Sequence, residues 1–423
     1  MQRRALLFLF FFLVASIIAA QTGRRLMLSI AYLLGATILV SLFWSWANLR
    51  WLSISRVTQT LRSQVGLPVE EQMQVRNLGW LPKLWIELRD FSEFPYHRVS
   101  RVINSLGPKN SSGWRVRTTA SDRGRYRLGP MEIVSGDPLG LFTFRRQLPQ
   151  NSYITVYPRT FDLPAFTPPI GRLLGGESIQ RRTHHVTPNF AGVRDYVPGD
   201  AFGRIHWRST ARTGRLIVKE FEEDPTADIW IVLDMHRDTR VQSTATAPRR
   251  RPETVFSWMH AEEIIVEPST TETAVTVAAS IMKHFLDQNR AVGMISYAQE
   301  REILQPDRGL RPLTHALEYL AVLQPEGNRR LEQVLTLEES FFTRGTTLVV
   351  VTSTPSSDWV AVLRELRRRG ITAIAVLVDP TSFDPAHFSL AEVRAALAIA
   401  AIPTYLVRQE DDIPTALSHA ITG

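Results

Sequence analysis

The chain has 423 residues, enough for two or three folding units at about 100–200 residues per domain. Hydrophobic residues make up 44% and charged residues 21%, a globular balance that excludes wholesale disorder. The net charge of +8 leaves nucleic acid or an anionic membrane open as partners, whereas the absence of cysteine excludes disulfides, thiolate metal sites and a cysteine nucleophile.

Two apolar segments near the N-terminus predict membrane-spanning helices. Residues 5–20 and residues 26–49 are uncharged and mostly apolar, and a span needs about 20 such residues. A signal peptide is the alternative for the first run, because Arg3 and Arg4 precede it. The second run and the lack of a clear cleavage site favour a helical hairpin. We therefore predict that residues 1–51 anchor the chain in a lipid bilayer through residues 5–49.

The arginines that flank these runs bear on orientation. Arginines on both outer sides of the hairpin favour a cytoplasmic location for those sides, whereas Arg24 and Arg25 in the turn oppose it. An even number of spans places the rest of the chain on the same side as the N-terminus. We expect a multi-pass membrane protein whose soluble domains are cytoplasmic.

Residues 52–160 contain short alternating runs separated by turn-forming stretches, which is typical of a small all-β sandwich. The predicted strands are Trp51–Val57, Glu70–Val75, Leu84–Leu88, Trp114–Thr118, Tyr126–Val134 and Tyr153–Tyr157. Such a domain is commonly a structural or interaction module.

From residue 227 to 423 strands and helices alternate, which predicts an α/β doubly wound domain. Four β-branched, almost continuously apolar runs indicate strands buried on both faces of a parallel sheet: Ile229–Asp234, Val292–Tyr297, Thr347–Ser353 and Thr372–Asp379. Tyr405–Arg408 is a further candidate. The predicted helices are Thr271–Asn289, Trp359–Arg369, Leu390–Ala401 and Pro414–Ala420, with capping boxes at Ser269/Glu272 and Ser389/Glu392.

The carboxyl ends of the parallel strands are where functional loops of such sheets lie. Asp234 ends the first strand, but His236 and Asp238 stand where hydroxyl ligands of Mg²⁺ would be expected. The fourth strand ends in Ser353 and Thr354, with no acid. Asp234 and Asp238 are thus the only candidates for a degenerate metal site. We predict no cofactor, with Mg²⁺ as the alternative.

Residues 161–226 form an arginine-rich connector between the two predicted domains. Its arginines suit an anion-binding face, but neighbouring acidic residues favour an ion-pair network. Within it His206-Trp207-Arg208 opens a helical turn that Gly214 ends. Neither a nucleic-acid module nor a P-loop, G-x-S-x-G or H-E-x-x-H motif is present. We expect no nucleic-acid partner and no catalytic residue.

The connector resembles the signature of the bacterial domain-of-unknown-function-58 family (DUF58). The matching residues are Arg194, Tyr196, Gly199, Asp200, Ile205, His206, Trp207, Ala211, Arg212, Leu216, Lys219 and Glu220. Upstream, Arg123-Gly124-x-Tyr126 and the run from Asp137 to Phe142 resemble it as well. With the hairpin before and the α/β domain after, the resemblance covers nearly the whole chain.

This resemblance implies a membrane-anchored protein with a C-terminal domain similar to von Willebrand factor A. It also implies a MoxR-type AAA+ ATPase partner and a role in maturing or remodelling client proteins. Of the metal-dependent adhesion site of von Willebrand A domains, only Asp234 is retained. The leading hypothesis is a non-enzymatic interaction and assembly factor in the bacterial cell membrane. The alternatives are an envelope-related hydrolase that uses the Asp200 and His206 region, and an extracytoplasmic metal-dependent adhesion protein.

Overall fold

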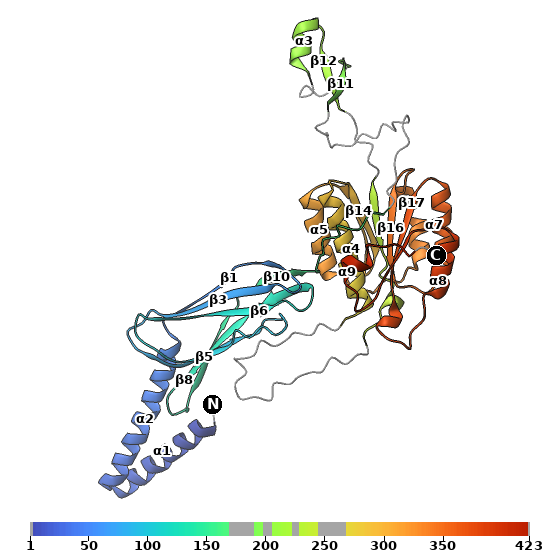
Figure 1. Ribbon diagram of the computed structural model, residues 1–423. Helices are drawn as coiled ribbons and strands as arrows, with labels where there is room; N and C mark the ends of the chain where they lie inside the picture. The colour runs from blue at the N-terminus through green and yellow to red at the C-terminus, as the bar shows by residue number, and fades with distance from the viewer. Residues whose placement is uncertain (1–2, 169–189, 198–204, 222–227, 244–267, 422–423) are drawn as a thin grey trace. The chain divides into compact units, whose positions relative to one another are not determined.

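The computed structural model describes residues 3–168, 190–197, 205–221, 228–243 and 268–421. The chain divides into two compact units. The first unit holds the elements from α1 to β10, and the second holds the strands from β11 onward (Figure 1). Each unit is described below by itself. The predicted domain boundaries at residues 51, 160 and 226 stay predictions.

The predicted helical hairpin is present as α1 (Arg3–Thr22) and α2 (Arg25–Leu49). Gly23 joins them in the left-handed region, with φ of 59°. Small side chains such as Ala15 and Ala31 are buried, and a Cβ on Gly35 would lie 3.0 Å from the ring of Phe12. Both helices are long and apolar enough to cross a membrane. By length and composition the hairpin is therefore compatible with membrane anchoring.

The first unit continues as three β-sheets, in which every strand pair is antiparallel except β2 with β10. One sheet has the order β1-β3-β6 and another the order β5-β4-β8-β9; a third has the order β2-β10-β7. Their bounds are β1 (Leu52–Thr58), β2 (Arg62–Gln64), β3 (Pro68–Asn77), β4 (Lys83–Asp90), β5 (Arg101–Leu106), β6 (Ser111–Thr119), β7 (Gly124–Leu128), β8 (Met131–Gly136), β9 (Thr143–Leu148) and β10 (Ser152–Tyr157). Met73 and Val75 of β3 share one buried core with Ile86, Leu88 and Ile133 of the facing sheet. This all-β part is called the sandwich below.

The sandwich differs from the sequence prediction in four places, of which the first is the short strand β2, which was not predicted. The predicted strand Tyr126–Val134 is two strands, because Gly129 has φ of 90° and Pro130 has no N–H to donate to a ladder. β5 was not predicted, and β9 was not predicted either because its exposed Arg145 and Arg146 carry no apolar alternation. The pairing to β8 holds β9 in place.

The second unit contains a six-stranded sheet in the order β15-β14-β13-β16-β17-β18. The strands are β13 (Ile229–Leu233), β14 (Val292–Tyr297), β15 (Arg301–Asp307), β16 (Thr347–Thr352), β17 (Thr372–Val378) and β18 (Thr404–Val407). Only β15, at one edge, runs antiparallel to its neighbour. Every residue of β13 and β16 is buried, as the continuous apolar runs predicted.

Helices pack against this sheet and supply the remaining core. They are α4 (Thr270–Asp287), α6 (Leu331–Leu337), α7 (Asp358–Arg368), α8 (Ala391–Ile399) and α9 (Ile413–Ala416). The helix α5 (Leu310–Val322) follows β15 in the chain, and its residues from Leu317 to Val322 are grouped with the first unit. Figure 1 shows α4 on one side of the strands and α7 and α8 on the other. Trp230 of β13 lies in one core cluster with Leu363 of α7 and Leu397 of α8. The α/β class is confirmed.

The two predicted capping boxes have different outcomes. Ser269 caps α4, and its Oγ accepts from the Glu272 N–H at 3.2 Å. The second box is wrong: α8 begins at Ala391, after the buried Leu390, and the Ser389 Oγ accepts from the Ala391 N–H. Burial of Leu390 in the core, which sequence spacing does not reveal, displaces the start of this helix.

Candidate functional site

The family-like segment folds around two paired strands, β11 (Phe190–Asp195) and β12 (Ile217–Phe221), with α3 (Trp207–Thr213) between them in sequence. Val218 of β12 pairs with Arg194 on β11 and forms a bridge with Ile205. The structure therefore brings the two halves of the motif together, although ten residues separate Arg194 from Ile205 in sequence.

The short helix α3 begins and ends as predicted. His206 occupies its N-cap, and its Nδ1 lies 2.7 Å from the Ser209 Oγ. Gly214 ends the helix in the left-handed conformation, with φ of 68°. The Thr210 Oγ1 accepts from the Ile217 N–H at 3.0 Å, which ties the helix to β12. His206 and Ser209 thus act locally as partners at the start of a helix.

The other predicted site residues are distributed as follows. Gly199 and Asp200 lie outside the described residues, and for Arg194, Lys219 and Glu220 only the backbone in β11 and β12 is described. The half-buried Tyr196 donates its N–H to the Leu216 carbonyl at 2.9 Å. Arg212 is exposed.

Four exposed apolar side chains distinguish this segment. Trp207 is 63% exposed, Val197 56%, Val193 44% and Leu216 41%. Arg208, Arg212 and Arg215 are exposed beside them in sequence, and Arg215 lies 3.9 Å from Asp195. We call these seven residues the motif surface. Val193 of β11 and Val197, which follows that strand, were not predicted as site residues, because valine is ordinarily interpreted as a core residue.

Asp234 lies at the carboxyl edge of the six-stranded sheet, where the sequence placed it. It is 7% exposed, and burial raises the pKa of its carboxyl group, although hydrogen bonds from Thr352 and His236 oppose this. Its Oδ2 accepts from the Thr352 Oγ1 at 2.6 Å and its Oδ1 from the His236 N–H at 3.1 Å. Both carboxylate oxygens therefore already have donors within the fold, from β16 and from the loop after β13.

The loop after Asp234 is held by further internal bonds. The His236 Nδ1 accepts from the Asp238 N–H at 3.3 Å. Asp238 has a side chain that is 78% exposed. Among the described residues, no group of three or more His, Asp or Glu side chains is placed to hold a metal ion. The prediction about Mg²⁺ stays a prediction.

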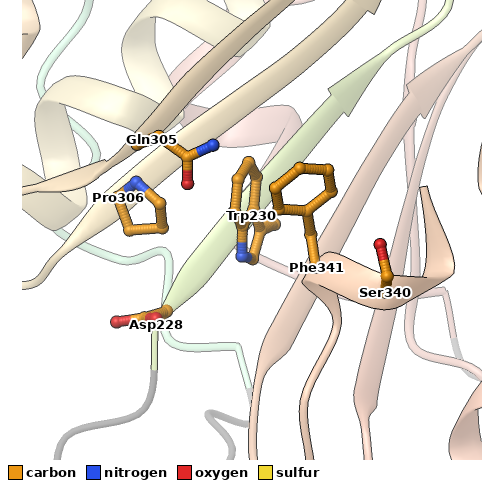
Figure 2. Close-up of a pocket in the computed structure, with 6 residues that line it drawn as sticks. All are labelled: Asp228, Trp230, Gln305, Pro306, Ser340 and Phe341. Atoms are coloured by element: carbon orange, nitrogen blue, oxygen red, sulfur yellow. The ribbon is translucent and has the colours of Figure 1, made fainter. Parts of the chain in front are cut away.

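A cavity of about 310 Å³ lies at the other end of β13. Figure 2 shows its lining, in which the Trp230 indole stands beside the Phe341 ring and Asp228 lies below them. The two ring centroids are 5.4 Å apart. Asp228 precedes β13 whereas Asp234 follows it, so this cavity is remote from the carboxyl edge of the sheet.

Comparisons with known proteins agree with the motif. The family described as Protein of unknown function DUF58 matches residues 192–258. The uncharacterized protein YeaD of Bacillus subtilis is 25% identical over 202 residues, 47% of this chain and 43% of that protein. The match thus spans less than half the length of this relative. These findings support a DUF58 family protein.

Two solved structures are similar in part. The conserved hypothetical protein BatB from Bacteroides thetaiotaomicron aligns with 45% of this chain and 95% of its own, at 15% identity and a TM-score of 0.30. A CARDB domain from Pyrococcus furiosus, solved with di-metal ions, aligns with 25% of this chain and 86% of its own, at 16% identity and a TM-score of 0.19.

Proposed function

We propose that this protein is a membrane-anchored interaction factor that works with a MoxR-type AAA+ ATPase on client proteins and performs no catalytic step itself. The observation that carries the proposal is the motif surface, where Trp207 is 63% exposed among arginines in the segment that the family matches. Tryptophan and arginine are the residues that most often dominate binding energy at protein interfaces. Exposed large apolar side chains accompanied by exposed charged ones are typical of an interaction site.

The second unit is proposed to be a von Willebrand A-like domain. Its sheet has one antiparallel edge strand, β15, and buried parallel strands at its centre. Asp234 is held by Thr352 and His236, which leaves its oxygens engaged. This arrangement favours a structural role for Asp234 over metal-dependent adhesion.

The hairpin is proposed to place the protein in the bacterial cell membrane with its soluble units in the cytoplasm. Arg4 lies at the start of α1 and Arg50 follows α2, so both outer ends of the hairpin carry positive charge. Positive residues remain preferentially in the cytoplasm. A cytoplasmic location is required if an ATPase is the partner.

Co-purification tests the partnership. The full chain and its Trp207→Ala variant would be extracted in detergent with a tagged MoxR-type ATPase from the same bacterium. Loss of a central interface tryptophan costs about 2 kcal/mol, so the affinity of the variant is expected to fall by about thirtyfold. Tyr153→Ala, which removes a 50% exposed aromatic side chain of the sandwich outside the motif segment, is the control. Equal recovery with all three proteins, or none with the wild type, contradicts the proposal.

A hydrolytic role is the second candidate, because the His206 Nδ1 lies 2.7 Å from a serine hydroxyl. If His206 serves only as the residue that begins the helix, His206→Asn supplies a side chain that is favoured at this position and leaves growth and envelope integrity unchanged. A loss of function in His206→Asn with an intact fold would favour the enzyme.

A further inference from the structure

The end of the sandwich next to α2 carries a cluster of exposed aromatic and basic side chains from three separate stretches of chain. It contains Trp46, Arg50, Trp51, Leu78, Trp80 and Lys109, and we call it the collar. Trp80 is 84% exposed, Trp51 52%, Leu78 44% and Trp46 42%. Such a group of exposed apolar side chains requires an explanation in a stable fold.

Ring, cation–π and hydrogen-bond contacts connect the members of the collar into one surface. The rings of Trp46 and Trp51 are 6.2 Å apart, and the Arg50 guanidinium lies 4.9 Å from the centre of the Trp46 ring. The Leu78 N–H donates to the Trp51 carbonyl at 2.7 Å. Residues from α2 and from the β3–β4 loop therefore meet at this end of the sandwich.

Lysine 109 extends the same surface from the β5–β6 loop. Its Nζ lies 5.2 Å from the centre of the Trp80 ring and donates to the Leu78 carbonyl at 2.6 Å. The collar thus combines tryptophans with cations, the composition that suits the headgroup layer of a membrane.

The joint between α2 and the sandwich is rigid, which fixes the position of the collar. The buried Asn48 donates to the Leu84 and Gly136 carbonyls, both at 3.0 Å. Lys83, also buried, donates to the Ala47 carbonyl at the end of α2, and burial lowers the pKa of its amine. α2 ends at Leu49 and β1 begins at Leu52, so no flexible linker separates them (Figure 1).

The length of α2 places this joint at the membrane boundary. Its 25 residues extend about 37 Å at 1.5 Å per residue, whereas the hydrocarbon core is about 30 Å thick. Because α2 begins with the charged Arg25, its first residue marks the opposite boundary of the core, and about 7 Å of helix at the C-terminal end, roughly its last turn, lies at headgroup depth. Trp46 belongs to that turn, and Trp51 follows it directly. The collar loops bonded to Trp51 are brought to the same level.

We propose that the collar binds the headgroup layer of an anionic bilayer, the same bilayer that the hairpin spans. The sandwich then sits directly on the membrane in a fixed orientation, and Arg50 and Lys109 face anionic lipid. This inference rests on the proposed membrane anchor, and the test separates the two.

Fluorescence quenching in vesicles tests the contact, because the chain has no cysteine and accepts single reporters. Leu78→Cys and Trp80→Cys each report on the collar. Val40→Cys, 61% exposed on α2, reports on insertion, and Leu67→Cys, 52% exposed before β3, is the control at the opposite end of that strand. Each full-length variant is labelled with an environment-sensitive fluorophore in vesicles of equal phosphatidylcholine and phosphatidylglycerol, with nitroxides on headgroups or deep in acyl chains.

Headgroup nitroxides are expected to quench both collar labels about threefold more strongly than the Leu67→Cys label, since the headgroup layer is only about 5–7 Å deep. Acyl-chain nitroxides are expected to quench the Val40→Cys label. If the Val40→Cys label is quenched and the collar labels match the Leu67→Cys control, the anchor stands and the collar proposal is overturned. If the Val40→Cys label is not quenched either, the membrane anchor itself fails.

Discussion

Replacing Glu71 with glutamine is expected to destabilise the sandwich by about 3 kcal/mol. The Glu71 side chain lies on β3 and is fully buried. Its Oε2 lies 2.8 Å from both the Arg56 Nη2 and the His97 Nε2, and the Thr58 Oγ1 donates to its Oε1 at 2.7 Å. A carboxylate only accepts hydrogen bonds, so the His97 Nε2 carries the proton. A glutamine side chain would replace one of the two accepting oxygens with an NH₂ group, which would then face groups that are themselves donors.

The magnitude follows from the pKa of the carboxyl group. Burial alone would raise the pKa of Glu71, but hydrogen bonds from His97, Arg56 and Thr58 and the charge of Arg56 lower it from 4.5 to about 2. Each pKa unit corresponds to 1.36 kcal/mol, so the lowered pKa means that the ionised carboxylate stabilises the folded state by about 3 kcal/mol. This agrees with the cost of about 3–5 kcal/mol for breaking a buried ion pair on one side.

Hydrogen exchange of the full chain in detergent measures the effect segment by segment, which a single melting temperature of a two-unit protein does not. In Glu71→Gln, the free energy of opening that exchange reports for peptides from β1 and β3 should be lower by about 3 kcal/mol at pH 7. Glu70→Gln is the control on the same strand, because its 42% exposed side chain lies 3.7 Å from Arg117 at the surface. Equal protection of wild type and Glu71→Gln would refute the reasoning.

The pH dependence has a defined sign. The folded pKa is lowered, so the stabilisation is complete above the ordinary value of 4.5 and is lost as the pH falls from 4.5 to about 2. The difference between wild type and Glu71→Gln should therefore shrink from about 3 kcal/mol at pH 7 to about 1 kcal/mol at pH 3. A difference that stays constant would mean that the carboxylate charge is not its source.

Two further substitutions test the second unit, again by hydrogen exchange of its strand peptides. Thr352→Val removes the hydroxyl that donates to the buried Asp234, and it should lower the stability of the second unit by about 1–3 kcal/mol. Unchanged protection of β13 and β16 would contradict this. Gly327→Ala would place a Cβ 2.2 Å from the Tyr297 carbonyl oxygen and 2.7 Å from that of Met235. The backbone must then shift, at a cost of about 1–3 kcal/mol. Protection of β14 equal to that of the wild type would contradict this, because it would mean that the loop shifts at no cost.

The parts of the fold that could be predicted are those in which local pattern and burial agree. Val292–Tyr297 was predicted to the residue, because a strand buried on both faces is mostly apolar. Gly214 marked the end of α3 because its conformation there requires positive φ. β9 was missed because neighbouring strands, rather than its own pattern of charged residues, hold it in the sheet.

The candidate sites were predicted less well, because their contacts join distant residues. Asp234 was placed correctly at the end of β13, but the Thr352 hydroxyl that binds its Oδ2 is 118 residues away in sequence. The collar likewise joins Trp51 to Lys109 through Leu78. Sequence spacing carries no information on such pairs. The motif surface and the collar are defined by how exposed their side chains are, and that exposure is known only once the chain is folded.

Topology tests the central claim most directly, because a cytoplasmic ATPase can act only on units that share its compartment. Ile399→Cys is a suitable single reporter, since Ile399 is 84% exposed on α8 and the chain has no cysteine of its own. Intact cells would be treated with a membrane-impermeant maleimide, with lysed cells as the control. The account predicts labelling only after lysis. Labelling in intact cells would place the second unit outside and contradict the proposed function.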